Sequence, residues 1–156
     1  MSTEKWIAGS GQGLTWGYAF ANSDVSGLAN GSSIRSSIVI TNGTALDIFC
    51  DISWICANTV TTAAPNYLGF YIYPLNEDAA TYGDGLYGSA AAGTPPGQYW
   101  VGNIGFVAAA STTVAGVLEK VVMPPGSFSF TVLNASGATT GANTICKYRT
   151  FNRAIS

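Results

Sequence analysis

The titratable side chains limit the chemistry that this chain could perform. It has no histidine, eight acidic residues and three cysteines, which argues against the usual triads and most zinc centres. A carboxylate pair could still hydrolyse a glycoside. Asp47 and Asp51 share one face of a predicted strand, with backbones roughly 13 Å apart, which is wide for that chemistry. We expect no catalytic residue and no enzyme; a β-sandwich glycan hydrolase is kept as an alternative.

Metal and thiol chemistry have little support in the sequence. The runs 76–78 and 84–85 offer oxygen ligands for calcium, but their spacing does not match an EF-hand loop. Cys50 and Cys56 lie on one predicted strand roughly 20 Å apart, too far for a disulfide. With Cys146, they are expected to act as small buried apolar residues. We therefore expect no metal and no cofactor.

Aromatic side chains gather around one long connection. Residues 67–73 and 99–107 alternate like strands, and the 74–98 segment between them is rich in Gly, Ala, Asp, Thr and Pro, without helical periodicity. Such long loops in compact domains are usually functional or disordered. Exposed Tyr and Trp favour binding surfaces. The aromatic residues of this region are Tyr67, Tyr71, Tyr73, Tyr82, Tyr87, Tyr99 and Trp100. Trp100, together with Phe70 of the first of these strands, is also a candidate for the second face of a sandwich core.

The chain is unusually poor in charge. Charged residues make up 9% of its 156 residues, with a net charge of −2, against about 25% charged residues in ordinary globular proteins. A partner or a homo-oligomer covering part of such a surface would explain how copies stay soluble. The only basic cluster is Lys147, Arg149 and Arg153, which is too small for a nucleic-acid stripe. The face shared by Lys147 and Arg149 is expected to be solvated or paired with acidic residues.

Targeting signals are not apparent. The first six residues contain no apolar signal segment, and no run approaches 18 consecutive apolar residues. We expect a protein made in a cytosol that neither enters a membrane nor binds nucleic acid.

Period-two alternation predicts the fold. Residues 32–41 and 44–57 are predicted strands joined by a hairpin at Asn42-Gly43. In the second, residues 46, 48, 50, 52, 54 and 56 form one apolar face. Further strands are expected at 67–73, 99–107, 114–123, 127–133 and 144–152, with Phe128, Phe130 and Val132 inward and the hydroxyl residues between them outward. Segments 6–7 and 14–20 are short strands, or an N-terminal arm within residues 1–30. The whole chain is therefore predicted to be one all-β domain, a jelly-roll-like sandwich of about eight strands with one long loop.

Several runs resemble small virion-associated proteins of tailed bacteriophages. They are Tyr71-Ile72-Tyr73-Pro74-Leu75-Asn76-Glu77-Asp78, Tyr82-Gly83-Asp84-Gly85, Tyr99-Trp100-Val101-Gly102, Pro124-Pro125-Gly126-Ser127-Phe128 and Cys146-Lys147-Tyr148-Arg149. The resemblance covers most of the chain from about Thr44 onward. It implies a virion structural role, most like a jelly-roll decoration (cement) protein that forms trimers or dimers between capsomers. These are turn and strand motifs, so the resemblance assigns no functional residue.

Three functions follow as hypotheses. In the first, the chain binds the major capsid protein on the outer surface of the shell and stabilises it. In the second, it is a tail or fibre module that binds host glycan through its aromatic loop. The third is the glycan hydrolase already described. The expected partner contacts are Trp6, Tyr82, Asp84, Tyr87, Tyr99 and Trp100.

Overall fold

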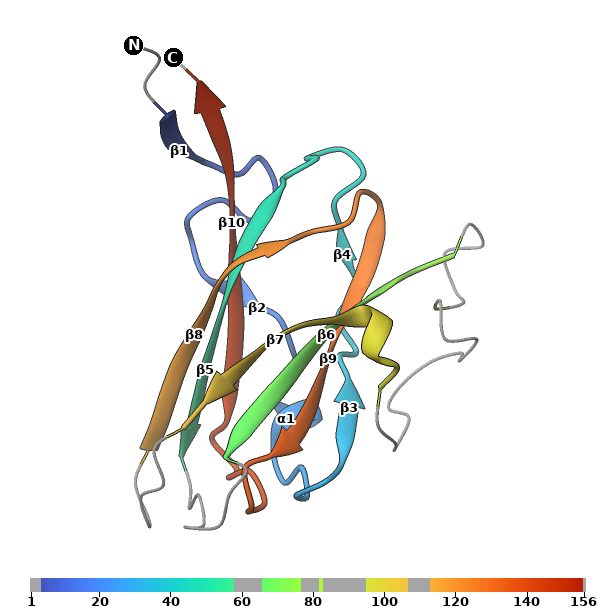
Figure 1. Cartoon of the computed structure of the whole chain (residues 1–156), viewed down its shortest axis with the longest axis vertical. Helices are drawn as coiled ribbons and strands as arrows, with labels where there is room; N and C mark the ends of the chain where they lie inside the picture. Colours follow the sequence, from blue (N-terminus) through green and yellow to red (C-terminus); the bar gives the residue numbers. More distant parts are fainter. Residues whose placement is uncertain (1–3, 58–65, 77–81, 83–94, 107–112, 156) are drawn as a thin grey trace.

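The protein folds as a two-sheet β-sandwich, seen here in a computed structural model (Figure 1). The structure describes residues 4–57, 66–76, 82, 95–106 and 113–155. Its strands are β1 (Glu4–Ala8), β2 (Gly17–Tyr18), β3 (Ser33–Arg35), β4 (Ile40–Thr41), β5 (Phe49–Ala57), β6 (Tyr67–Pro74), β7 (Trp100–Gly105), β8 (Thr113–Val122), β9 (Ser127–Ala135) and β10 (Ile145–Ile155). A four-residue helix, α1 (Asn22–Val25), and a 3₁₀ turn, η1 (Gly97–Tyr99), complete the described elements.

The strand order is that of a jelly roll. Sheet A has the order β1-β10-β5-β8, with β2 also paired to β10; sheet B has the order β3-β9-β6-β7, with β4 also paired to β9. All of these pairings are antiparallel. If β1 with β2, and β3 with β4, are each counted as one interrupted strand, sheet A holds the first, eighth, third and sixth strands. Sheet B then holds the second, seventh, fourth and fifth, which is the double Greek key of a jelly roll. The predicted all-β, jelly-roll-like sandwich is confirmed.

The core lies between the two sheets and follows the predicted alternation. Phe128, Phe130 and Val132 of β9 are fully buried, and Trp54 of β5 packs edge-on against Phe70 of β6. The other alternate residues of β5 that face the core are Cys50, Ile52 and Cys56, all buried. Period-two burial arises because successive side chains of a strand point to opposite faces of the sheet.

The N-terminal residues belong to the sandwich as an edge strand. β1 pairs with the last residues of β10, from Glu4 opposite Ile155 to Ala8 opposite Phe151. Of the predicted strand at 14–20, only Gly17 and Tyr18 form a ladder, and α1 follows directly. The two chain ends therefore leave the molecule side by side (Figure 1). No helix in the described ranges is long and apolar enough to span a membrane.

The predicted hairpin at Asn42-Gly43 is wrong. β4 pairs with β9 in sheet B, whereas β5 lies in sheet A, so the segment after Asn42 crosses between the sheets. The Asn42 side chain closes this crossing. Its Oδ1 accepts from the Asp47 backbone N–H, and its Nδ2 donates to the Asp47 and Pro124 carbonyls. β5 consequently begins only at Phe49, and the expected inward residues Leu46 and Ile48 are exposed.

The hydroxyl residues of β9 point outward as predicted, but they are not exposed to solvent. Ser129 and Thr131 are buried although they point away from the core between the sheets. The Ser129 hydroxyl donates to the Ser36 carbonyl at 3.0 Å, because the chain between β3 and β4 folds over this face. β9 is flanked by strands on both edges, and the Ser129 hydroxyl finds its hydrogen-bond partners inside the protein.

Two glycines let β7 and β8 approach at one edge of the sandwich. A Cβ at Gly116 of β8 would collide with Ile104 of β7, and a Cβ at Gly102 of β7 would collide with Leu118 of β8. Reciprocal glycines opposite large apolar side chains bring the edge strands of the two sheets together there.

Candidate binding surface

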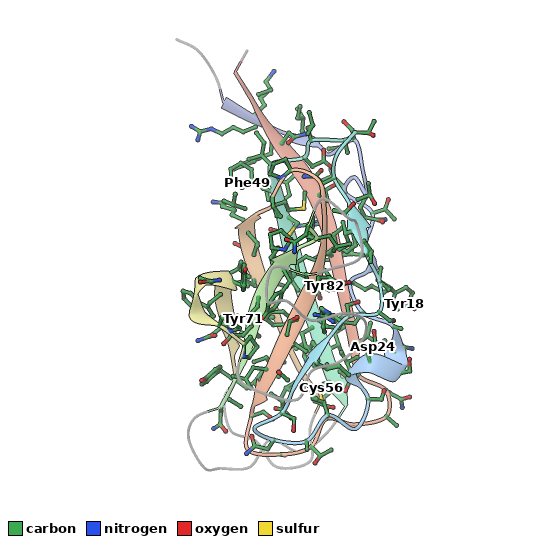
Figure 2. All side chains as sticks on the ribbon, turned by 90° about the vertical axis from the view of Figure 1, so that its right-hand side faces the viewer. Tyr18, Asp24, Phe49, Cys56, Tyr71 and Tyr82 are labelled. Atoms are coloured by element: carbon green, nitrogen blue, oxygen red, sulfur yellow. The ribbon has the colours of Figure 1, made fainter. Side chains whose placement is uncertain are left out.

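Tyr82, an expected contact residue, is buried. It is 6% exposed and packs with Tyr71 and Tyr73 on the outer face of sheet B. The Arg35 guanidinium lies 3.7 Å from the centre of its ring. An isolated bridge between Leu75 and Tyr82 brings Tyr82 back towards the end of β6. The expectation that Tyr82 presents its ring to a partner is therefore wrong, because it closes a second apolar cluster (Figure 2).

The other residues expected around the loop have different environments. Tyr99 is half-buried, with its ring centre 4.6 Å from that of Tyr73. Trp100 is 52% exposed, and its Nε1 donates to Oδ1 of Asn103 at 2.9 Å. Placing Trp100 in the core is thus wrong, whereas its exposure agrees with a contact role. Asp84 and Tyr87 lie outside the described residues, as does most of the 74–98 segment.

Trp6 belongs to the other sheet. It is 54% exposed in β1, opposite Arg153 of β10. The described contact candidates therefore divide between the two sheets: Trp6 on sheet A, and Tyr82, Tyr99 and Trp100 with sheet B. They do not form one binding surface.

The outer face of sheet A brings together residues from distant parts of the sequence. Directly paired residues share a face, so the register places Phe151, Phe49 and Val122 in one row across β10, β5 and β8. A second row holds Tyr18, Lys147, Ser53 and Val117. Phe49 lies towards the end of the molecule with the chain termini, and Tyr18 lies farther from it (Figure 2).

Three aromatic rings form a cluster on this face. Trp6 makes edge-on contacts with Phe49 and Phe151, at ring-centre distances of 5.8 and 5.2 Å. Phe49 and Phe151 stack on one another at 5.8 Å. Edge-to-face arrangements of this kind contribute beyond the buried area. The cluster fastens the edge strand β1 to the two central strands of sheet A.

Three aromatic residues of the N-terminal segment make cation–π contacts with basic side chains on this face. Lys120 lies over Trp6 at 5.4 Å, Arg149 over Trp16 at 4.8 Å and Lys147 over Tyr18 at 4.9 Å. Cations attract the negative face of an aromatic ring. The residues Lys147 and Arg149, predicted to share a face, do so, and both are covered in part by the N-terminal segment.

Asp51 organises the charged part of the surface. Its Oδ2 accepts from Nε of Arg149 at 3.0 Å and lies 2.9 Å from Nη2 of the same guanidinium. Its Oδ1 accepts from the backbone N–H of Lys120 at 3.0 Å. Lys120 and Glu119 occupy a bulge where the β5–β8 register shifts, and Lys120 has a positive φ of 56°. Bulges redirect side chains, and the hydrogen bond from the Lys120 backbone N–H to Asp51 stabilises this bulge.

A groove crosses the surface beside these groups. Its volume is about 270 Å³, and its lining combines apolar and charged side chains. The lining residues are Trp6, Leu14, Phe151, Asp51, Arg149, Glu119 and Lys120. We call this the sheet A groove.

Asp47 does not share a strand face with Asp51, and its carboxylate binds the N-terminal segment instead. It precedes β5, and its carboxylate accepts the backbone N–H groups of Ser10 and Gly11 and the Asn152 amide. Burial alone would raise the pKa of Asp47, but hydrogen bonds from Thr150, Gly11, Ser10 and Asn152 together bring it below the ordinary value of 3.8. This carboxylate fixes the loop after β1 to the sandwich.

The thiols are buried and unpaired, as expected. Cys50, Cys56 and Cys146 form no disulfide. Burial raises the pKa of the Cys50 and Cys146 thiols well above the usual range, so they stay protonated. Among the described residues, no group of three or more Cys, His, Asp or Glu side chains is placed to hold a metal ion.

The fold and this surface define the class of the protein as a two-sheet jelly-roll sandwich with an aromatic and cationic outer face. No protein family model matches the chain. No curated protein is similar to it at a significant level.

Sequence reasoning found Trp6 but missed its neighbours. Phe49, Phe151 and Lys120 lie on three different strands, and their meeting depends on the strand order. One signal was present: Phe49 and Phe151 are large apolar residues on the mixed, non-core faces of their predicted strands. Large apolar side chains at such positions indicate a second packed layer or an interface.

Proposed function

We propose that this protein is a capsid decoration (cement) protein of a tailed bacteriophage. It binds the major capsid protein on the outer surface of the shell. The resemblance of several runs to small phage virion proteins suggests this role. The jelly-roll fold expected from that resemblance is the fold of the chain. In this role the protein is made in the host cytoplasm and resides on the virion.

The observation that carries the proposal is the apolar outer face of sheet A. Five of the eleven exposed large apolar side chains in the described residues lie on it: Trp6, Tyr18, Ile55, Val117 and Val122. Exposed apolar side chains that are concentrated on one sheet face are a feature of protein–protein contact sites. A charge content of 9% also suits large interfaces, whose centres are depleted in charge.

Multiple copies would supply the affinity. A decoration protein binds a symmetric lattice of identical sites, so modest contacts from each copy add up when the protein is a trimer or dimer. β1 and the end of β10 pair with one another at one end of the sandwich, where a neighbouring subunit could contact them without disturbing the core.

The second candidate is a tail or fibre module that binds host glycan. It is favoured by Trp100, which is half-exposed in β7 and fixed by Asn103; an exposed indole beside an amide suits stacking on a sugar ring with hydrogen bonds to its hydroxyls. Tyr82 cannot take part in this stacking because it is buried.

Near-atomic imaging of the intact particle tests the proposal. Density for this chain at capsomer junctions on the outer shell, in a copy number comparable to that of the major capsid protein, is the expected result. Density confined to the tail would overturn the decoration role and favour the glycan-binding module.

A further inference from the structure

We propose that the free edge of β1 pairs in an antiparallel ladder with β1 of a second copy of this chain, so that sheet A continues from one protomer into its partner. A two-fold axis relates the two strands, with Trp6 facing the partner's Trp6. The inference does not rest on the proposed function, because it follows from the backbone pairing and the side chains of β1.

β1 lacks the protection that edge strands usually have. It lies at the end of sheet A beside β10, and no other described strand pairs with it (Figure 1). An unpaired edge is a template for another chain, which proteins commonly block with proline, bulges or charge. β1 contains no proline, and its ladder with β10 has no register shift. The opposite edge strand of sheet A, β8, carries the bulge at Glu119 and Lys120, so β1 is the more available edge.

The hydrogen-bonding groups of β1 are used on one side only. The Gly9 N–H donates to the Thr150 carbonyl in the register of the β1–β10 ladder. Because these groups alternate in direction along a strand, Lys5 and Ile7 also turn their backbone N–H and C=O groups to β10. The backbone groups of residues 4, 6 and 8 point the other way, and no backbone hydrogen bond from the described loops reaches them. The free edge therefore offers three evenly spaced pairs of donors and acceptors.

Both faces of β1 expose a large apolar side chain. Trp6 on the outer face is 54% exposed, and Ile7 on the opposite face is 45% exposed. Facing side chains on neighbouring strands stabilise a ladder, and aromatic and β-branched residues do so most. The net charge of −2 sets little repulsion between copies. A strand laid along β1 would therefore cover apolar surface on both faces.

The backbone and charge patterns of β1 are self-complementary in one register. With Trp6 opposite the partner's Trp6, residues 4 and 8 also face one another, and about six hydrogen bonds form, two for each facing pair. Sliding one strand by two residues in either direction leaves about four. One of these shifted registers also sets Lys5 opposite the partner's Lys5, and like charges directly opposite are destabilising. In the Trp6-centred register Lys5 lies opposite the partner's Ile7, so a second copy fits this edge.

Sedimentation equilibrium of the full chain tests the inference. We expect the wild type to dimerise with a Kd on the order of 100 µM, since a short ladder buries little area. Ala8→Pro removes an outward N–H and places a proline ring on the free edge, so it should weaken the dimer by about tenfold or more. Ala8→Val is the matched control; it keeps the N–H, and its Kd should stay within about threefold of wild type. A wild type that is monomeric at about 1 mM, or equal dimerisation of wild type and Ala8→Pro, would overturn the inference.

Cross-linking tests the register with β1 intact, and it decides the matter if hydrogen exchange shows that Ala8→Pro detaches β1 from β10. In the proposed dimer Lys5 and the partner's Ile7 form a non-hydrogen-bonded pair with Cα atoms about 4.5 Å apart, a separation that a disulfide can span. Mild oxidation of mixed Lys5→Cys and Ile7→Cys chains should therefore give more mixed disulfides than random pairing would. The three native cysteines are buried and do not compete. Random or mostly same-variant pairing would refute the proposed dimer.

Particle imaging distinguishes a second copy from another protein. We expect two sandwiches joined through β1. A strand of a capsid or tail protein on β1 would overturn the inference and assign the edge to that protein. Joined sandwiches found in the tail would refute only the decoration role, and single sandwiches on the shell would refute only the dimer.

Discussion

Asp47→Asn is expected to loosen the N-terminal segment in a pH-dependent way. The carboxylate accepts from the Ser10 N–H at 2.7 Å, the Gly11 N–H at 2.9 Å and the Asn152 amide at 3.0 Å. An asparagine amide offers one acceptor oxygen and turns an NH₂ group towards one of these donors. A hydrogen bond to a charged group is worth about 1.5–3 kcal/mol. We therefore expect a loss of about 2–3 kcal/mol in the free energy of unfolding at pH 7.

The loss should shrink in acid. The pKa of Asp47 is lowered in the folded protein relative to its ordinary value of 3.8. The stabilisation by the carboxylate is therefore fully present above about pH 4 and is lost as the pH falls through the folded-state pKa. Once Asp47 is protonated, the wild type resembles the asparagine variant, so the two stability curves should converge below about pH 4.

Urea unfolding from pH 7 to pH 2.5, with hydrogen exchange of residues 4–13, measures both effects. Glu119→Gln is the control, because Glu119 is an exposed carboxylate and its loss should change stability by less than about 0.5 kcal/mol. Equal stability of Asp47→Asn and wild type at pH 7 would refute the reasoning, as would a deficit of the same size at both ends of the pH range.

The remaining predictions concern packing and are measured by urea denaturation. Tyr82→Ala should lower the free energy of unfolding by about 3 kcal/mol, because Tyr82 is buried beneath Arg35. Trp100→Ala should lower it by less than about 1 kcal/mol, because Trp100 is exposed. A larger loss for Trp100→Ala than for Tyr82→Ala would contradict the burial of Tyr82 and the exposure of Trp100. Gly116→Ala should cost about 1–3 kcal/mol through its collision with Ile104. Gly105→Ala is its control, since nothing lies within 4 Å of an added Cβ at Gly105. Equal losses of stability in the two variants would contradict the prediction that the collision with Ile104 makes Gly116→Ala destabilising.

Much of the fold could be predicted from local sequence pattern. The alternation of Phe128, Phe130 and Val132 identified a strand and its core face, and all three are fully buried. The alternation that includes Trp54 did the same for β5. These predictions succeed because a strand directs successive side chains to opposite faces whatever its partners are. The lack of any sustained helical period likewise indicated the all-β class.

The errors arise where the answer depends on partners distant in the sequence. Asn42-Gly43 has the composition of a hairpin turn, but its flanking strands pair with β9 in one sheet and with β10 and β8 in the other. Ser129 looks like an outward residue, yet a neighbouring segment covers it. Tyr82 and Trp100 are both aromatic residues near one loop, and only packing makes the first buried and the second exposed.

The sequence by itself determined the all-β class, the core faces of the main strands, the absence of a feasible disulfide between Cys50 and Cys56, and the scarcity of charge. Only the tertiary structure decided where a binding surface forms. Trp6, Phe49, Phe151 and Lys120 come from four strands, and no local pattern encodes that they meet. Strand order and register place them together, because long-range pairing is set by the packing of the whole sandwich rather than by any one segment.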